Sequence, residues 1–175
     1  MKGTRGGFRP LRREQLLQEK VHDSYKSRVK LSDPTRCPEC GAVFRGGRWT
    51  WETAPEGSSE NLCPACQRIR DKFPAGYVAL SGEFLLQHRD EILQLARHCE
   101  ENEKGRHPLQ RIMSIEDRKD GVLVTTTDVH LARNIAERIH DAYKGSLAFR
   151  YNREENLIRA KIGRASCRER VYVLV

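Results

Sequence analysis

The sequence Cys37-Pro-Glu-Cys40-Gly41 is followed by the related sequence Cys63-Pro-Ala-Cys66, with 22 residues between Cys40 and Cys63. A spacer of two residues lets both thiolates of a pair point at one centre, and two such pairs supply the four sulfurs of a tetrahedral zinc site. Gly41 permits the turn that follows the first pair. We therefore expect one structural Zn²⁺, with a single iron or an iron–sulfur cluster as the next alternative. The expected metal ligands are Cys37, Cys40, Cys63 and Cys66.

Other chemistries fit the two cysteine pairs less well. A thioredoxin-type redox pair belongs to a βαβ pattern, which neither pair has. A catalytic zinc keeps one coordination position open, whereas four cysteines fill the shell. The sequence also shows no Ser/His/Asp set, no paired carboxylates and no phosphate-binding GxxxxGK motif. We expect no enzymatic activity and no small-molecule substrate.

Aromatic and basic residues alternate between the two cysteine pairs, around a short hairpin expected at Gly46-Gly47. If exposed, they could stack on unpaired nucleic-acid bases. The alternative, which we favour, is that they form a small core around the metal. Because Trp49 and Trp51 are two residues apart on one expected strand, both should be buried or both exposed. The residues concerned are Phe44, Arg45, Arg48, Trp49 and Trp51.

Charge is distributed unevenly along the chain, which has 175 residues and a net charge of +8. Residues 1–36 carry +6 and residues 162–175 carry +2, whereas residues 37–161 are neutral. A basic end attracts polyanions such as RNA, DNA or the ribosome surface, although it can also serve as a solubilising tail. The candidate nucleic-acid-binding residues are Arg5, Arg9, Arg12, Arg13, Arg45, Arg48 and Trp49.

The composition favours a cytoplasmic protein. Hydrophobic residues make up 38% of the chain, without an apolar run long enough to cross a membrane. The N-terminal residues lack the apolar segment of a secretory signal. In a reducing compartment, the six cysteines are expected as metal ligands or buried thiols rather than disulfides.

The sequence after the cysteine pairs predicts helices and strands in one domain. A helix over 82–104 follows the apolar run 77–80, with Ser81 as its N-cap. Strands at 109–116 and 122–126 precede a helix capped by Thr127 or Asp128, and strands at 147–151 and 157–161 follow it. The expected fold class is α+β: a small four-cysteine, zinc-ribbon-like module, then a helix and a ββαββ domain with a four-stranded antiparallel sheet.

Four segments result from this pattern. Residues 1–34 form a basic, partly disordered tail with a marginal helix, residues 35–80 the zinc module, and residues 81–161 the helix and the ββαββ domain. Residues 162–175 stand apart, because Ile162–Val171 reads like an in-frame translation of a common sequencing-library adapter. We expect that this last segment is not native sequence.

Six stretches together resemble a family of small bacterial proteins over about residues 1–161. That family in turn resembles the large-subunit ribosomal export adaptor of the nonsense-mediated-decay type, chiefly in the paired CPxC module. The stretches are CPECG at 37–41, GGRWTW at 46–51, CPACQRI at 63–69, PAGY at 74–77, HPLQRIM at 107–113 and TTTDVHLARNI at 125–135. The resemblance implies a ribosome- or RNA-facing role.

Residues and resemblance together favour a non-enzymatic zinc-binding protein that contacts RNA or the ribosome through its basic end and zinc module. The alternative is a zinc-stabilised adaptor that binds another protein and has no nucleic-acid role.

Overall fold

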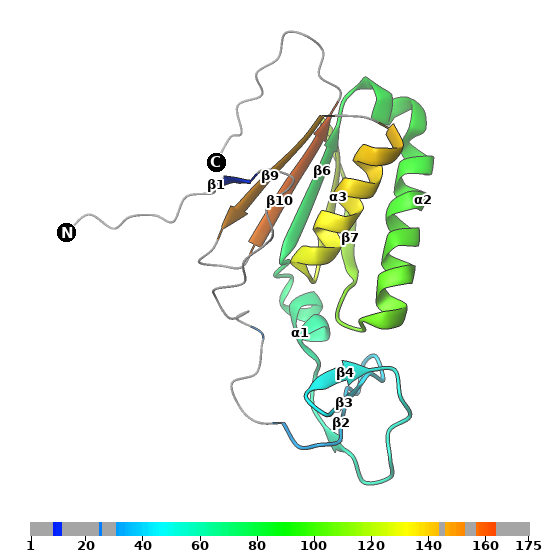
Figure 1. Cartoon of the computed structure of the whole chain (residues 1–175), viewed down its shortest axis with the longest axis vertical. Helices are drawn as coiled ribbons and strands as arrows, with labels where there is room; N and C mark the ends of the chain where they lie inside the picture. The colour runs from blue at the N-terminus through cyan, green and yellow to red at the C-terminus, as the bar shows by residue number, and fades with distance from the viewer. Residues whose placement is uncertain (1–8, 12–24, 26–30, 144–145, 153–156, 164–175) are drawn as a thin grey trace, which may run out of the picture.

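The computed structural model describes residues 9–11, 25, 31–143, 146–152 and 157–163. The chain contains both helices and strands, as expected for an α+β protein (Figure 1). Their order is β1 (Arg9–Leu11), β2 (Thr35–Arg36), β3 (Val43–Arg45), β4 (Arg48–Thr50), β5 (Ser59–Glu60), α1 (Pro64–Asp71), β6 (Gly76–Ser81), α2 (Glu83–Arg106), β7 (Ile112–Arg118), β8 (Gly121–Thr126), α3 (Val129–Tyr143), β9 (Ser146–Asn152) and β10 (Leu157–Gly163).

The larger sheet has six strands in the order β1-β9-β10-β6-β8-β7, and it is mixed. Strand β6 pairs in parallel with β10 and antiparallel with β8. The prediction of a four-stranded, purely antiparallel sheet was therefore wrong. The apolar run at 77–80 is a central strand rather than a lead-in to the helix, with Val78 and Leu80 buried on the helix side. Ser81 ends this strand, and the N-cap of α2 is Gly82, which makes no side-chain cap.

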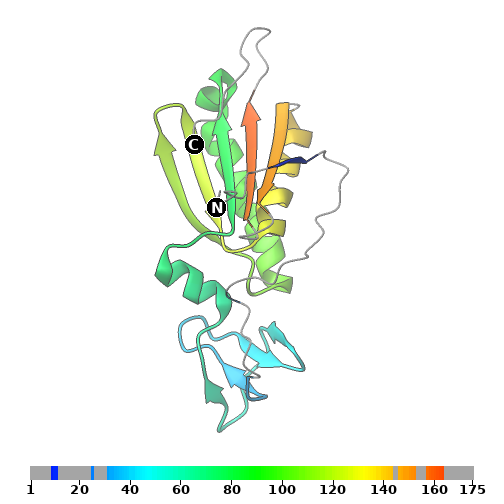
Figure 2. The ribbon, with the colours of Figure 1, turned by 90° about the vertical axis from the view of Figure 1, so that its left-hand side faces the viewer.

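Helices α2 and α3 lie on the same side of the six-stranded sheet (Figure 2). The apolar stripe of α3 is fully buried, with Leu131, Ile135 and Ile139 at 2% exposure or less. Helix α2 adds Ile92 and Ala96 to the same core cluster. We call this sheet with its two helices the sheet domain, and its apolar core is its main source of stability.

The start of α3 is capped as the sequence predicted. One carboxylate oxygen of Asp128 accepts from the backbone N–H groups of His130 at 2.8 Å and Leu131 at 3.1 Å. These two bonds satisfy donors that have no partner within the helix. Asp128 is thus the cap, whereas Thr127 bonds the backbone of the loop before β7.

A run of glutamates near the end of α2 opposes the helix dipole, from which we expect fraying before Gly105, but the last turn is helical. Tertiary contacts outweigh that repulsion. Glu100 accepts from the N–H of Ile112 at 2.9 Å, Glu103 accepts from the amide of Asn134 at 2.8 Å, and the carbonyl of Lys104 accepts from a tryptophan described below. The helix consequently runs to Arg106.

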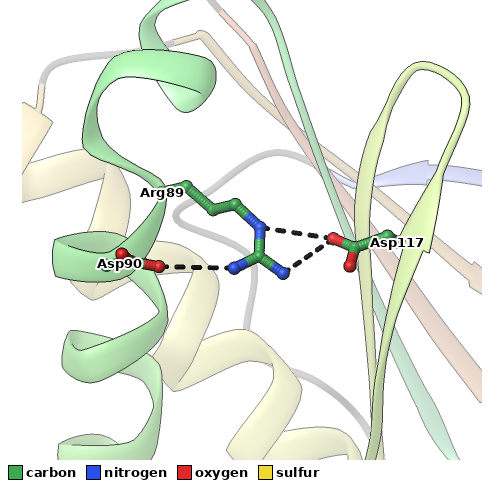
Figure 3. A network of polar contacts seen from close by, with 3 residues as sticks. All are labelled: Arg89, Asp90 and Asp117. Atoms are coloured by element: carbon green, nitrogen blue, oxygen red, sulfur yellow. Dashed lines mark hydrogen bonds and ion pairs between the residues drawn. The ribbon is translucent and has the colours of Figure 1, made fainter.

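An ion pair joins the other end of α2 to the β7–β8 hairpin (Figure 3). Arg89 donates through Nε at 3.2 Å and through Nη2 at 2.7 Å to one oxygen of Asp117, and its Nη1 lies 3.3 Å from Asp90. The side chains of both aspartates are largely exposed, so this pair adds little stability and mainly orients the hairpin.

A second sheet, in the order β4-β3-β2-β5, lies below α1 in Figure 1. The predicted hairpin is present, since β3 and β4 pair antiparallel around Gly46 and Gly47, both with positive φ. We call residues 31–71, which comprise this sheet and α1, the Cys module. Strand β6 lies in the other sheet, so the expected boundary at residue 80 falls at the end of a sheet-domain strand.

The two ends of the chain are described only in part. Residues 9–11 form β1 at the edge of the six-stranded sheet, within the segment expected as a tail. The marginal helix expected at 11–29 lies almost wholly outside the described residues. Strand β10 continues through Ile162 and Gly163, and residues 164–175 lie outside the description. Within the described part of the chain, no helix has the length and apolar character needed to cross a membrane.

Gly76, where the chain enters β6, is a test of how closely α3 packs on the sheet. A Cβ at this position would clash with the side chains of Ala132 and Thr126. We expect Gly76→Ala to destabilise the sheet domain by about 1–3 kcal/mol, the usual cost of overpacking a core. Urea unfolding followed by circular dichroism measures this change.

Gly105→Ala is the matched control. A Cβ on Gly105, inside α2, meets nothing within 4 Å. Because glycine is a poor helix former, this variant should be equally stable or slightly more stable than the parent. Equal unfolding midpoints for Gly76→Ala and the parent protein would contradict the close packing of α3 on β6.

Candidate metal centre

The first cysteine pair lies in a tight turn directly after β2. The N–H of Gly41 donates to the carbonyl of Cys37 at 2.9 Å, and the N–H of Cys37 donates to the carbonyl of Ala42 at 2.8 Å. Gly41 adopts a φ of +77°, which glycine adopts without strain. This turn brings Cys37 and Cys40 to the same side of the chain.

The second pair lies at the start of α1. Cys63 is the N-cap, and Pro64 occupies the first helical position, where its missing N–H costs nothing. The sulfur of Cys63 accepts from the N–H of Cys66 at 3.4 Å. The sulfur of Cys37 accepts from the N–H of Cys63 at 3.4 Å, so backbone donors link the two pairs.

The four sulfurs form one cluster that could hold a metal ion. All four lie within 4.8 Å of one another, and those of Cys40 and Cys63 are 3.7 Å apart. A tetrahedral site with metal–sulfur distances of about 2.3 Å has sulfur–sulfur edges of about 3.8 Å. All four thiols are free, and a sulfur separation of 3.7 Å is far longer than a disulfide bond.

The cluster is also the centre of a small core. Cys37 and Cys63 are fully buried and Cys66 is 3% exposed. Ala42, Ala65 and Trp49 are the other buried members, and Leu109, from the loop before β7, packs against them. Few apolar side chains surround the sulfurs, so this core alone would stabilise the Cys module weakly.

Arg111, a residue that the sequence did not single out, reaches the sulfurs from the sheet domain. It is 8% exposed, and its Nη1 lies 3.4 Å from the sulfur of Cys66 and its Nη2 3.9 Å from that of Cys63. An arginine inside a segment expected as a strand, 109–116, was the available signal. A guanidinium at this place offsets the negative charge of thiolates.

The thiol pKa values reflect this crowding. Burial raises the pKa of Cys63 to about 11, and the nearby charges of Cys40 and Cys37 act in the same direction. Burial raises the pKa of Cys66 too, with Cys63 as the next cause. At Cys40 burial acts to raise the pKa, but hydrogen bonds from Arg111 and the backbone at Ala42 outweigh it and lower the pKa to about 7. A metal bound here would displace protons, so its affinity should fall in acid.

The structure separates the candidate nucleic-acid-binding residues. Arg45 and Arg48 are exposed at the end of the β3–β4 hairpin. Trp49 is buried, with its ring centroid 5.6 Å from that of Phe44, so it belongs to the core and offers no free face for a base. Arg5, Arg12 and Arg13 lie outside the described residues, and only the backbone of Arg9 is described, in β1.

Trp51 does not share the environment of Trp49, so the prediction that both are buried or both exposed was wrong. Strand β4 ends at Thr50, and the alternation of faces ends with it. Trp51 is 40% exposed, and its indole Nε1 donates to the carbonyl of Lys104 in α2 at 2.6 Å.

Comparison with protein-family models, with curated proteins and with solved structures finds no significant match for this chain. The metal centre therefore rests on the geometry of its own residues.

Proposed function

We propose that the four cysteines bind one structural Zn²⁺ and that the chain is a non-enzymatic binding protein. The observation that carries this proposal is the set of four buried or half-buried sulfurs at the spacing of a tetrahedral site. Four thiolates suit Zn²⁺ and leave no open position for a substrate or an activated water. The weak apolar core of the Cys module explains why a metal is needed for folding.

Single replacement of Cys37, Cys40, Cys63 or Cys66 by Ser should abolish tight zinc binding and unfold the Cys module. A serine hydroxyl does not ionise near neutral pH, so it is a poor zinc ligand. Structural zinc contributes about 10–16 kcal/mol of apparent binding free energy in finger peptides, more than this small core could replace. Zinc per chain by elemental analysis, with circular dichroism on the same samples, measures both effects.

Cys99→Ser is the matched control, because Cys99 is a buried thiol in the separate core of the sheet domain. It should retain about one zinc per chain. The sheet domain should keep its secondary structure in all variants, since it has its own apolar core. Tight zinc binding that survives a replacement at any of the four positions, or the colour of an iron–sulfur cluster, would disprove the assignment.

We further propose that the partner is RNA, free or within the ribosome. The β3–β4 hairpin supports this proposal, because Arg45 and Arg48 are directly opposite each other in the register. Like charges at opposed positions destabilise a sheet, so this pair lowers the stability of the hairpin unless an anion binds to it. Glu52 lies 3.6 Å from Arg45 and leaves Arg48 as the stronger site for an anion.

The charge of the N-terminal end also supports an anionic partner. Residues 1–36 carry +6, whereas residues 31–71, the Cys module, hold five basic and six acidic residues. The module as a whole therefore does not attract RNA by net charge. Affinity would come from the basic end together with the hairpin tip, and it would weaken steeply as salt rises.

Replacing both Arg45 and Arg48 by Gln should weaken RNA binding and lower its salt dependence. Each lost phosphate contact reduces the slope of log affinity against log salt by about 0.7 for a single strand. Fluorescence anisotropy of the full chain with a labelled single-stranded RNA, repeated over a range of salt, measures affinity and slope. Replacement of both Arg97 and Arg106, exposed residues on α2, by Gln is the control, because it removes the same charge elsewhere on the protein.

Equal losses in the two double variants would show that the hairpin is not a specific contact. Absence of salt-dependent binding to RNA or to purified ribosomes would remove the RNA proposal while leaving zinc binding untouched.

A protein partner is the second candidate, and one observation favours it. Ile69, in α1, and Phe73, just after it, are large apolar residues that are 40% and 43% exposed. A partner whose binding is insensitive to salt and is lost in Phe73→Ser, but not in the arginine variants, would support this function instead.

A further inference from the structure

Arg111 is fixed to the sheet domain by its backbone and by one side-chain nitrogen. Its N–H donates to the hydroxyl of Thr127 at 2.9 Å, and its carbonyl accepts from the N–H of Thr127 at 2.9 Å. Its Nε donates to the carbonyl of Pro108 at 2.7 Å. Thr127 in turn lies between β8 and α3, so the position of the guanidinium is set by the sheet domain.

The other end of the same side chain binds the Cys module. Nη1 and Nη2 point to two different sulfurs, those of Cys66 and Cys63, at 3.4 and 3.9 Å. The planar fork of arginine can donate to both sulfurs while Nε stays on Pro108, a geometry that lysine does not offer. One side chain thus links the loop before β7 to two sulfurs in the core of the Cys module.

Two further contacts surround this bridge. The indole of Trp51, in the Cys module, donates to the carbonyl of Lys104, which lies in the last turn of α2 where carbonyls have no partner within the helix. The guanidinium carbon of Arg111 lies 5.7 Å from the centre of the Trp51 ring, within range of a cation–π contact. Leu109 adds its side chain to the core around the sulfurs.

These contacts form a second connection between the two parts of the protein. The first is the chain itself, residues 72–75 between α1 and β6. It is hydrogen-bonded at both ends, since the N–H of Phe73 donates to the carbonyl of Arg68 at 3.0 Å and the N–H of Ala75 donates to the carbonyl of Thr126 at 2.9 Å. The second connection comes from the C-terminal end of α2 and the loop before β7, so both connections together set the orientation of the Cys module.

We propose that metal binding fixes the orientation of the Cys module relative to the sheet domain, because the metal holds in place the sulfurs to which Arg111 donates. We call this contact between Arg111 and the metal centre the joint. The inference rests on the metal binding proposed above, and it assigns Arg111 the role of a positioning residue rather than a ligand. Without the metal, Cys63 and Cys66 are no longer held at the spacing that the guanidinium spans. Loss of the metal then releases the module from the sheet domain as well as unfolding it.

Reciprocal coupling makes the joint testable. If metal binding stabilises the contact between the two parts, then that contact must strengthen metal binding by the same factor. Arg111→Gln should keep about one zinc per chain at saturation but bind it about 10- to 100-fold more weakly in competition with a chelator. Trp51→Phe removes the bond to Lys104 and changes the ring that faces Arg111, but it alters no ligand, and it should also weaken zinc binding, by several-fold.

Hydrogen exchange over residues 104–111 provides a readout other than metal affinity. In the zinc-loaded parent protein, the amides of His107 and Arg111 are hydrogen-bonded and should be protected. Chelation of zinc, or Arg111→Gln with zinc bound, should each speed their exchange tenfold or more. Chelation of zinc from Arg111→Gln should increase the exchange rate little further, because the contact between Arg111 and the sulfurs is already lost in this variant. Arg111→Lys should resemble Arg111→Gln, since it keeps the charge without the fork.

Arg106→Gln, next to the joint but exposed, is the control and should change neither zinc affinity nor exchange. The proposal would be overturned if zinc did not change hydrogen exchange over residues 104–111 in the parent protein. It would also be overturned if Trp51→Phe had the zinc affinity and the exchange rates of the parent protein. If Arg111→Gln does not fold, the measurements on the parent protein with and without zinc and on Trp51→Phe are sufficient to test the proposal. A parent protein without zinc would instead refute the metal assignment, which elemental analysis of the same sample reveals.

Discussion

Four sulfurs held within 4.8 Å of one another form the constraint on which the Cys module depends. Packed this closely in a buried place, thiolates repel each other, and burial together with that repulsion raises the pKa of Cys63 and Cys66. A divalent cation at the centre would turn this repulsion into attraction. The turns before Ala42 and at the start of α1 then need only to aim the sulfurs, and a core of few apolar side chains is sufficient.

The sheet domain is stabilised differently. Its core is a continuous apolar cluster between the six-stranded sheet and the helices α2 and α3, and it involves none of the four clustered cysteines. If the Cys module binds metal as proposed, its stability would depend on metal, whereas that of the sheet domain would not. The contact from Arg111 to the sulfurs joins the two parts, and it needs the Cys module to be folded. This contact would therefore depend on metal as the Cys module does.

Local patterns in the sequence predicted local features of the structure, since the two-residue spacers predicted the sulfur cluster and Asp128 the cap of α3. Features that depend on distant residues were not predictable in this way. The parallel pairing of β6 with β10 joins segments about 80 residues apart, and a short apolar run does not reveal its partner. Arg111 is 45 residues from Cys66, and its role follows from the fold rather than from any motif. Trp51 lies one residue past the end of β4, so the alternation that buries Trp49 no longer governs it.

The joint and the hairpin tip lie in different parts of the Cys module, and this separation matters for how the module would work. Arg45 and Arg48 are exposed at the end of the β3–β4 hairpin, whereas the sulfurs are buried or half-buried, and two of them lie against Arg111. Loss of the metal would remove the tip by unfolding the hairpin. Loss of the Arg111 contact alone would leave the hairpin folded but would change its orientation relative to the six-stranded sheet. An RNA long enough to touch both parts would then bind differently after loss of the metal and after loss of the Arg111 contact.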